Sequence, residues 1–325
     1  ALVLAGLLDD DMHEAVEHGV FKNDQLFVHQ YIQTARHKTT VQARRENELI
    51  VFQHIPCTAG DSMEAMLFLD VDRTVRHAAP FRRAWREHGA TALERTEWFL
   101  ARVDNRTTIL SGFLSQVDID VLRERLPSRT LTRFTFLRDP RERALSMVEF
   151  NNIDECASIA RVLDGNEVPC SFAWALETLV NRSRVVDGRL VLHDAFAQSF
   201  LVNTQTWQLG NSMYDDARNL SLSDDELLRR AKRALDEMAF VGFYDDLAND
   251  FLGLWRTVFP HAQIPIFFPA LFWFGALVSR PRIEVRKFTL RARAIDPRFV
   301  TFIERAVALD EQLFAYAVEK FKRGR

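Results

Sequence analysis

Two strand-to-helix junctions carry the residues of this chain that are best suited to binding an anion. The first, residues 48–69, is typical of a buried strand, a tight loop that contains Gly60, and an amphipathic helix. Unpaired N–H groups at a helix N-terminus bind phosphate, and a glycine lets the backbone approach closely. The second, residues 134–146, places Arg138 at the end of an apolar strand, where its guanidinium can grip a phosphate with two hydrogen bonds. Ser146 can donate a hydroxyl about two helical turns later.

The two junctions together resemble the cofactor sites of sulfotransferases that use 3'-phosphoadenosine 5'-phosphosulfate (PAPS), especially the carbohydrate, heparan-sulfate 2-O-sulfotransferase-like branch. In that family the first junction usually reads His-Ile-Pro-Lys-Thr-Ala-Gly-Thr-Ser and holds the 5'-phosphosulfate. Residues 54–62 match it except that Cys57 replaces lysine and Asp61 replaces threonine. The second junction grips the 3'-phosphate in the family, and residues 136–146 match its pattern at every fixed position.

The resemblance implies a set of cofactor-binding residues for PAPS and for its product 3',5'-adenosine bisphosphate, with no metal. The set comprises Thr58, Ala59, Gly60, Asp61, Ser62, Arg138, Ser146, Thr206 and Trp207. Thr206 and Trp207 belong to Asn203–Gly210, which looks like the family segment that helps to close the nucleotide site. Trp207 stands where arginine is usual. Its ring can stack on adenine, and packing in the core is the competing interpretation.

The residues at the implied catalytic positions do not suit the chemistry. Sulfuryl transfer needs a base for the acceptor hydroxyl and positive charge near the departing phosphate oxygen. Cys57, at the position of the family lysine, supplies no positive charge, and Phe113, at the position of the family histidine, cannot take a proton. Asp61 has the spacing of a helix cap with Glu64, but it would oppose an anionic ligand by roughly 1–4 kcal/mol.

Two functions are therefore predicted as alternatives. The first is a sulfotransferase that acts on a carbohydrate or small hydroxylated acceptor, in which another residue replaces the missing base or charge. The candidates are His54, His77 and His88 as the base, although each is more often a structural or surface residue, and Arg141 or Arg143 as the charge. The second is a catalytically silent protein of the same fold that binds a nucleotide, a glycan or a protein partner.

The elements that must position these residues are those of an α/β fold. Apolar segments at 48–54, 107–113, 131–138 and 239–243 predict core strands separated by helical patterns, as in a mostly parallel, doubly wound sheet. We expect a P-loop-like phosphate-binding turn after the first strand and helical additions towards the C-terminus.

Two helix starts follow from the pattern of capping and apolar residues. Ser223 and Glu226 form the capping-box pattern of a helix, and a last helix is predicted from Asp296 through Phe321. The sequence shows no clean domain boundary, but the resemblance implies a sulfotransferase-like domain at residues 48–325, preceded by an N-terminal extension at residues 1–47.

Composition restricts the partners. At 325 residues with 47% apolar content, the chain can bury a substantial core, and its net charge of −3 predicts no general nucleic-acid binding. A basic cluster at Arg133, Arg138, Arg141 and Arg143 is predicted to face an anionic ligand, whereas the role of a second, from 280 to 293, stays open.

An aromatic segment, residues 264–278, is too short for a spanning helix, so no transmembrane segment is predicted. It is either a surface for a lipid or hydrophobic partner or a buried connection. Localisation stays open between the cytoplasm of a prokaryote and the Golgi lumen. Cys156 and Cys170 can pair or be thiols in a reducing compartment, and sequons at Asn105, Asn181 and Asn219 are a mild hint of a secretory lumen.

Overall fold

The computed structural model describes residues 47–58, 63, 74–77, 103, 107–148, 172–193, 195–214, 218–259 and 297–323. The predicted N-terminal extension, the aromatic segment 264–278, the second basic cluster, Cys156 and Cys170 lie outside these residues, apart from Asn47 at the end of the extension. Within the described part of the chain, no helix is long and apolar enough to cross a membrane.

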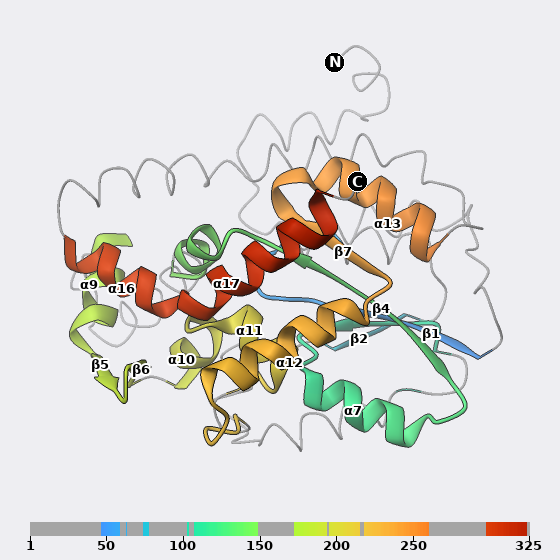
Figure 1. The fold of residues 1–325 in the computed structure, drawn as a ribbon, viewed down its shortest axis with the longest axis horizontal. Coiled ribbons are helices and arrows are strands. Elements are labelled where there is room, and N and C mark those ends of the chain that lie inside the picture. Colours follow the sequence, from blue (N-terminus) through green and yellow to red (C-terminus); the bar gives the residue numbers. More distant parts are fainter. Residues whose placement is uncertain are drawn as a thin grey trace, which may run out of the picture.

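A parallel sheet forms the centre of the described structure (Figure 1). Its five strands, in spatial order, are β2 (Thr74–His77), β3 (Ile109–Gly112), β1 (Glu48–Gln53), β4 (Thr130–Leu137) and β7 (Phe240–Phe243). Every neighbouring pair is parallel. The α/β class, the parallel sheet and the four predicted strands are confirmed; the edge strand β2 was not predicted.

Alternation along the central strand β1 sends its apolar side chains to both faces of the sheet. Ile50 and Phe52 pack with the buried face of α13 (Leu247–Val258). Leu49 and Val51 pack with α7 (Gln116–Arg125), which lies on the opposite side of the strands (Figure 1). A strand buried on both faces reads as a continuous apolar run, which is why residues 48–53 were recognisable in the sequence.

The remaining elements build a helical layer beside the sheet and a separate hairpin. They are α9 (Phe172–Asn181), β5 (Ser183–Val186), β6 (Arg189–Leu192), α10 (Ala195–Leu201), α11 (Thr204–Gly210), α12 (Asp224–Asp236), η2 (Tyr244–Asp246), α16 (Pro297–Ala306), α17 (Ala308–Ala317) and η3 (Val318–Lys322). β5 and β6 pair antiparallel. Apolar residues of α12 and α17 pack together with the ends of β4 and β7, so these helices cover the sheet next to the carboxyl ends of those strands.

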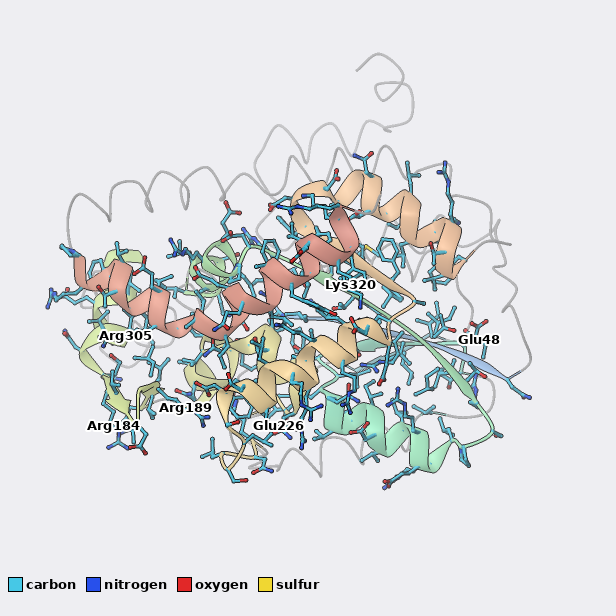
Figure 2. All side chains as sticks on the ribbon, viewed as in Figure 1. Glu48, Arg184, Arg189, Glu226, Arg305 and Lys320 are labelled. Atoms are coloured by element: carbon cyan, nitrogen blue, oxygen red, sulfur yellow. The ribbon has the colours of Figure 1, made fainter. Side chains whose placement is uncertain are left out.

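The two halves of the predicted Ser223–Glu226 capping box behave differently in the structure. The Ser223 hydroxyl accepts a hydrogen bond from the Glu226 N–H at 3.2 Å, which confirms the serine cap of α12. The Glu226 carboxylate accepts hydrogen bonds from Arg229 and Arg230 instead of from the backbone N–H of Ser223. At the other end of α12, Asp236 accepts a hydrogen bond from Lys320 at 2.6 Å, which ties the C-terminal turn to this helix (Figure 2).

The prediction of one continuous C-terminal helix is wrong. Val307 (φ −119°, ψ 13°) leaves the helical conformation between α16 and α17. The reason is tertiary: the carbonyl oxygen of Ala306 accepts a hydrogen bond from the Asn203 N–H at 2.7 Å, and the first N–H groups of α17 donate to the Asn203 side chain. A residue far away in the sequence therefore interrupts an apolar pattern that looks unbroken.

Gly242 tests how tightly the sheet is packed. It pairs with Phe136 across β4 and β7, and a Cβ at Gly242 would lie 2.3 Å from that ring. We expect Gly242→Ala to lower the free energy of unfolding by about 1–3 kcal/mol, measured by chemical denaturation. Gly253→Ala on α13 is the matched control, because its Cβ would lie 3.1 Å from Phe240 and alanine favours the helix. Equal losses in the two variants would contradict this account.

Candidate functional site

The two junctions meet at one edge of the sheet, because β1 and β4 are neighbouring parallel strands. After β1 the chain makes a tight turn, in which the Thr58 N–H and hydroxyl both donate to the carbonyl oxygen of Ile55, at 3.3 and 2.7 Å. Cys57 occupies this turn with a positive φ of 63°, which is uncommon for a residue with a side chain. Met63 follows as a helical residue that is fully buried against the sheet, as its spacing predicted.

Arg138, at the end of β4, reaches across to this turn. Its Nη1 donates to the carbonyl oxygen of Cys57 at 3.2 Å, its guanidinium lies 4.5 Å from the centre of the Tyr244 ring, and its Nη2 lies 3.8 Å from a carboxylate oxygen of Glu142. The side chain is 5% exposed. Its Nε is buried and has no hydrogen-bond acceptor among the described residues. The structure thus brings Arg138 and the Cys57 turn into direct contact.

Two glutamines of α11 hold the ends of three strands in place. The Gln205 amide accepts from the N–H of Arg138 at 3.3 Å and donates to its carbonyl oxygen at 3.2 Å. The Gln208 amide donates to the carbonyl oxygen of His54 at 2.9 Å and to that of Leu114, after β3, at 3.1 Å. Both glutamine side chains are buried. Helix α11 therefore fixes the backbone at the carboxyl ends of β1, β3 and β4 through two buried side chains.

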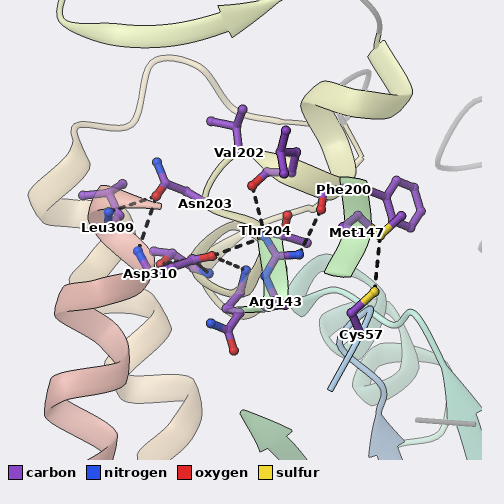
Figure 3. A network of polar contacts seen from close by, with 12 residues as sticks. Cys57, Arg143, Met147, Phe200, Val202, Asn203, Thr204, Leu309 and Asp310 are labelled. Atoms are coloured by element: carbon purple, nitrogen blue, oxygen red, sulfur yellow. Dashed lines mark hydrogen bonds and ion pairs between the residues drawn. The ribbon is translucent and has the colours of Figure 1, made fainter. Parts of the chain in front are cut away.

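Helices α11 and α17 cap each other (Figure 3). Asn203 has a left-handed conformation (φ 47°), and its Oδ1 accepts from the N–H groups of Leu309 and Asp310 at the start of α17. In return, the Asp310 carboxylate accepts from the N–H groups of Gln205 and Thr206, at 3.2 and 2.7 Å, and from the Thr206 hydroxyl at 2.7 Å. Each helix start is thus satisfied by a side chain from the other helix.

Arg143 completes this buried polar network (Figure 3). Its two terminal nitrogens donate to the carbonyl oxygens of Phe200 and Leu201, at 2.9 and 3.0 Å, and Nη2 lies 3.8 Å from an Asp310 carboxylate oxygen. Burial lowers the pKa of Arg143 and raises the pKa of Asp310, and the charge of each partner opposes the shift of the other. The network joins the helix over residues 140–148 to α10, α11 and α17.

Cys57 and Phe113 lie in apolar surroundings rather than in a polar catalytic site. The Cys57 thiol donates to the thioether of Met147 at 3.5 Å (Figure 3). The Phe113 ring centre lies 4.6 Å from that of His54 and 5.8 Å from that of Phe200. Cys57 and Phe113 both pack against a cluster formed by Met147, Phe200, Met213 and Tyr214, which we call the sulfur-aromatic cluster. The two departures from the family pattern therefore share one environment.

The other predicted site residues divide into three groups. Ser146 is partly buried on the helix over residues 140–148 that starts after Arg138. The Thr206 hydroxyl is committed to Asp310, and Trp207, 5% exposed, packs in a buried leucine cluster with Arg218 over its ring at 4.8 Å, so its contacts support the packing interpretation. Ala59, Gly60, Asp61, Ser62 and His88, and the side chain of His77, lie outside what the structure describes.

The prediction that the basic cluster faces an anionic ligand is wrong for three of its four arginines. Arg133, 1% exposed, donates to Gln53 and Gln116 and pairs with Glu237, and burial lowers its pKa to about 10. Arg141 pairs with Glu311 at 2.6 Å. Arg133, Arg141 and Arg143 thus bind protein groups, and of the four only Arg138 lies at the turn. A linear sequence cannot reveal this division, because the partners are distant along the chain.

Four residues of the site were not predicted as site residues from the sequence: Gln205, Gln208, Asn203 and Asp310. Asn203, Gln205 and Gln208 lie in the family-like segment 203–210, and Asp310 begins a second family-like segment, residues 310–316, so these segments are the signal in the sequence that points to them. In the part of the chain that is described, no group of three or more His, Cys, Asp or Glu side chains is arranged to hold a metal ion.

No family model matches the chain, and a search of curated proteins gives no significant match.

Proposed function

We propose that the chain has a doubly wound, sulfotransferase-like fold and binds PAPS, or its product 3',5'-adenosine bisphosphate, where β1 and β4 end. The strand order supports this position. The two strands of this sheet that follow β1 in the chain, β2 and β3, lie on one side of β1, whereas β4 and β7 lie on the other side. In open parallel sheets, ligands bind outside the carboxyl ends of strands at such a reversal. The turn after β1 is then the P-loop-like turn.

The contact between Arg138 and the Cys57 turn carries the proposal. A guanidinium nitrogen that is buried without an acceptor is costly, by about 1–3 kcal/mol, and an anionic ligand oxygen would remove that cost. The 3'-phosphate would take this donor together with the Ser146 hydroxyl. Gln205 holds the backbone of Arg138 on both its polar atoms, so the guanidinium starts from a fixed position.

The reaction that fits this cofactor is sulfuryl transfer to a carbohydrate or another small hydroxylated acceptor. The acceptor oxygen would form a bond to sulfur while the bond from sulfur to the phosphate oxygen breaks, and the acceptor proton would pass to a base. Among the candidate bases, His54 is the one whose side chain the structure describes, and its ring contacts Phe113 just after β3. Its 6% exposure and its stacking on Phe52 leave it little access to an acceptor.

A catalytically silent nucleotide-binding protein is the second candidate, and the sulfur-aromatic cluster favours it. Sulfuryl transfer needs charge and a proton acceptor at the positions of Cys57 and Phe113, but both side chains pack against apolar groups. These contacts stabilise the site without contributing to chemistry. The retained Arg138 arrangement accounts for binding in either case.

Calorimetric titration with 3',5'-adenosine bisphosphate tests the cofactor. We expect binding to the unmodified chain, and about 10- to 100-fold weaker binding to Arg138→Gln, because a charge-assisted hydrogen bond to phosphate contributes about 1.5–3 kcal/mol. Arg229→Gln is the matched control, since Arg229 pairs with Glu226 on the exposed side of α12. Absence of binding to the unmodified chain would refute the cofactor assignment, and turnover of labelled PAPS would separate the active from the silent candidate.

A further inference from the structure

The guanidinium of Arg138 lies on the face of an aromatic ring. β4 and β7 pair in parallel with Leu137 opposite Phe243, so the residues that follow the two strands, Arg138 and Tyr244, leave the sheet side by side. The Arg138 Cζ lies 4.5 Å from the centre of the Tyr244 ring. The face of an aromatic ring carries partial negative charge and attracts a cation, and burial strengthens the attraction. Arg138 and Tyr244 are both buried, at 5% and 7% exposure.

The residue that precedes Tyr244 is held by two helices. The N–H of Phe243 donates to the buried carboxylate of Asp250 on α13. The Phe243 ring packs edge-on against that of Phe314 on α17, with 5.9 Å between the ring centres. Tyr244 begins η2 directly after this strand. Its ring is therefore a fixed surface on which the guanidinium of Arg138 rests.

Stacking on Tyr244 orients the guanidinium without using its N–H groups. A guanidinium is planar, and its donors point outward within that plane. The ring lies against a face of the group, while Nη1 donates to the carbonyl oxygen of Cys57 at 3.2 Å. Nε is buried and has no acceptor among the described residues. The ring thus determines the plane in which a ligand oxygen must lie to accept from Nε of Arg138.

The other contacts of Arg138 define this plane only loosely. Gln205 binds the backbone of Arg138, and several rotatable bonds separate that backbone from the guanidinium. The carbonyl oxygen of Cys57 holds one nitrogen, about which the group can still turn. Glu142 lies 3.8 Å from Nη2 and its side chain is 30% exposed, so water screens this pair. Tyr244 supplies the remaining constraint.

We propose that Tyr244 is a positioning residue for anion binding at Arg138, and that its ring sets how strongly the site prefers a nucleotide with a 3'-phosphate over the same nucleotide without it. The inference rests on the proposed function, in which the 3'-phosphate takes the Nε donor of Arg138. A guanidinium that is already ordered loses little rotamer freedom when the phosphate binds. Without the ring, the phosphate would have to order the guanidinium itself, and binding would be weaker.

Calorimetric titrations with 3',5'-adenosine bisphosphate and with adenosine 5'-monophosphate test this role, because the ratio of the two affinities reports on the 3'-phosphate. We expect Tyr244→Leu to lower the preference for the bisphosphate by about 3- to 10-fold, with little change for the monophosphate. Tyr244→Phe keeps the ring and should keep the preference. In the Arg138→Gln background, Tyr244→Leu should change the preference no further. Tyr316→Leu is the matched control, because the Tyr316 ring lies against lysines of α12 and η3 instead.

A second variant covers the case in which Tyr244→Leu does not fold. Pentafluorophenylalanine at position 244 keeps the shape of the ring but removes the negative charge from its face, so the preference should fall there as well. NMR of the ligand-free chain gives a measurement that needs no nucleotide. The Nε–H signal of Arg138, identified by its absence in Arg138→Gln, should carry a ring-current shift in the unmodified chain and in Tyr244→Phe, and should lose it in Tyr244→Leu.

An unchanged preference in Tyr244→Leu and in the pentafluorophenylalanine variant, or an equal fall in Tyr244→Leu and Tyr244→Phe, would overturn the positioning role. The same Arg138 signal with and without the ring would overturn it too. If the unmodified chain does not bind the bisphosphate, the proposed function fails instead, and the Nε–H signal still decides whether Tyr244 orients Arg138.

Discussion

Asp310→Ala is expected to lower the free energy of unfolding by about 3–5 kcal/mol, the range for breaking a buried ion pair by removing one partner. Asp310 is fully buried, accepts from two N–H groups and one hydroxyl of α11, and is the counter-ion of Arg143. Removing its carboxylate would leave Arg143 charged in the core and would uncap α11. Denaturant unfolding followed by circular dichroism measures the loss.

Two further variants separate the ion pair from the cap. Asn203→Gly removes the cap of α17 while it still allows the left-handed backbone at this position (φ 47°), and it should cost about 1 kcal/mol. Arg143→Met combined with Asp310→Leu removes both charges together, and it should cost clearly less than the sum of the two single changes, because neither charge is then left alone. Additive losses in the double variant would show that Arg143 and Asp310 do not act as a pair.

Helix α11 links the buried Arg143–Asp310 network to the proposed phosphate site. Gln205 donates its N–H to Asp310 and holds the backbone of Arg138 with its side chain, so a single residue joins the buried network to the proposed phosphate site. A C-terminal helix thereby fixes the position of a residue at the end of β4. Weakened caps should loosen the geometry of the site before they unfold the sheet.

The sequence predicted the sheet well for a physical reason. Strands β1, β3 and β7 are buried throughout, β4 is buried over its last five residues, and each strand carries a short apolar stretch, which is a local property of the chain. β2, Thr74–His77, is an edge strand in which two of four residues are basic, and it carries no such signal. Burial of a strand on both faces is thus visible in the sequence, whereas pairing at an edge is not.

The details of the site were less predictable, because they depend on contacts between distant segments. Asn203 breaks the C-terminal helix from about a hundred positions away, and the partners that engage Arg133 and Arg141 come from other elements. Cys57 and Phe113 appeared in the sequence as separate departures from the family pattern. In the structure the two side chains pack against the same apolar cluster, so a change at one position alters the surroundings of the other.

This linkage leads to the largest functional effect we expect. Cys57→Lys combined with Phe113→His should raise sulfuryl transfer from labelled PAPS to sugar acceptors at least about 100-fold above the unmodified chain. The lysine would supply positive charge at the departing phosphate oxygen, and the histidine would supply a base beside His54; each contribution is typically about 10²-fold or more. Each single change should give far less, because transfer needs both groups.

The apolar double variant Cys57→Met, Phe113→Leu is the matched control, and it should stay as slow as the unmodified chain. The new lysine would add a positive charge near Arg138 and Arg143, so the ligand-free double variant should be less stable than the unmodified chain. Bisphosphate should therefore stabilise the double variant more strongly, and thermal unfolding with and without bisphosphate measures this difference. If the unmodified chain already transfers sulfate rapidly, the silent candidate is wrong, and loss of turnover in His54→Ala would then identify the base. If bisphosphate binds the double variant and transfer still does not rise, the residues at positions 57 and 113 are not what limits transfer.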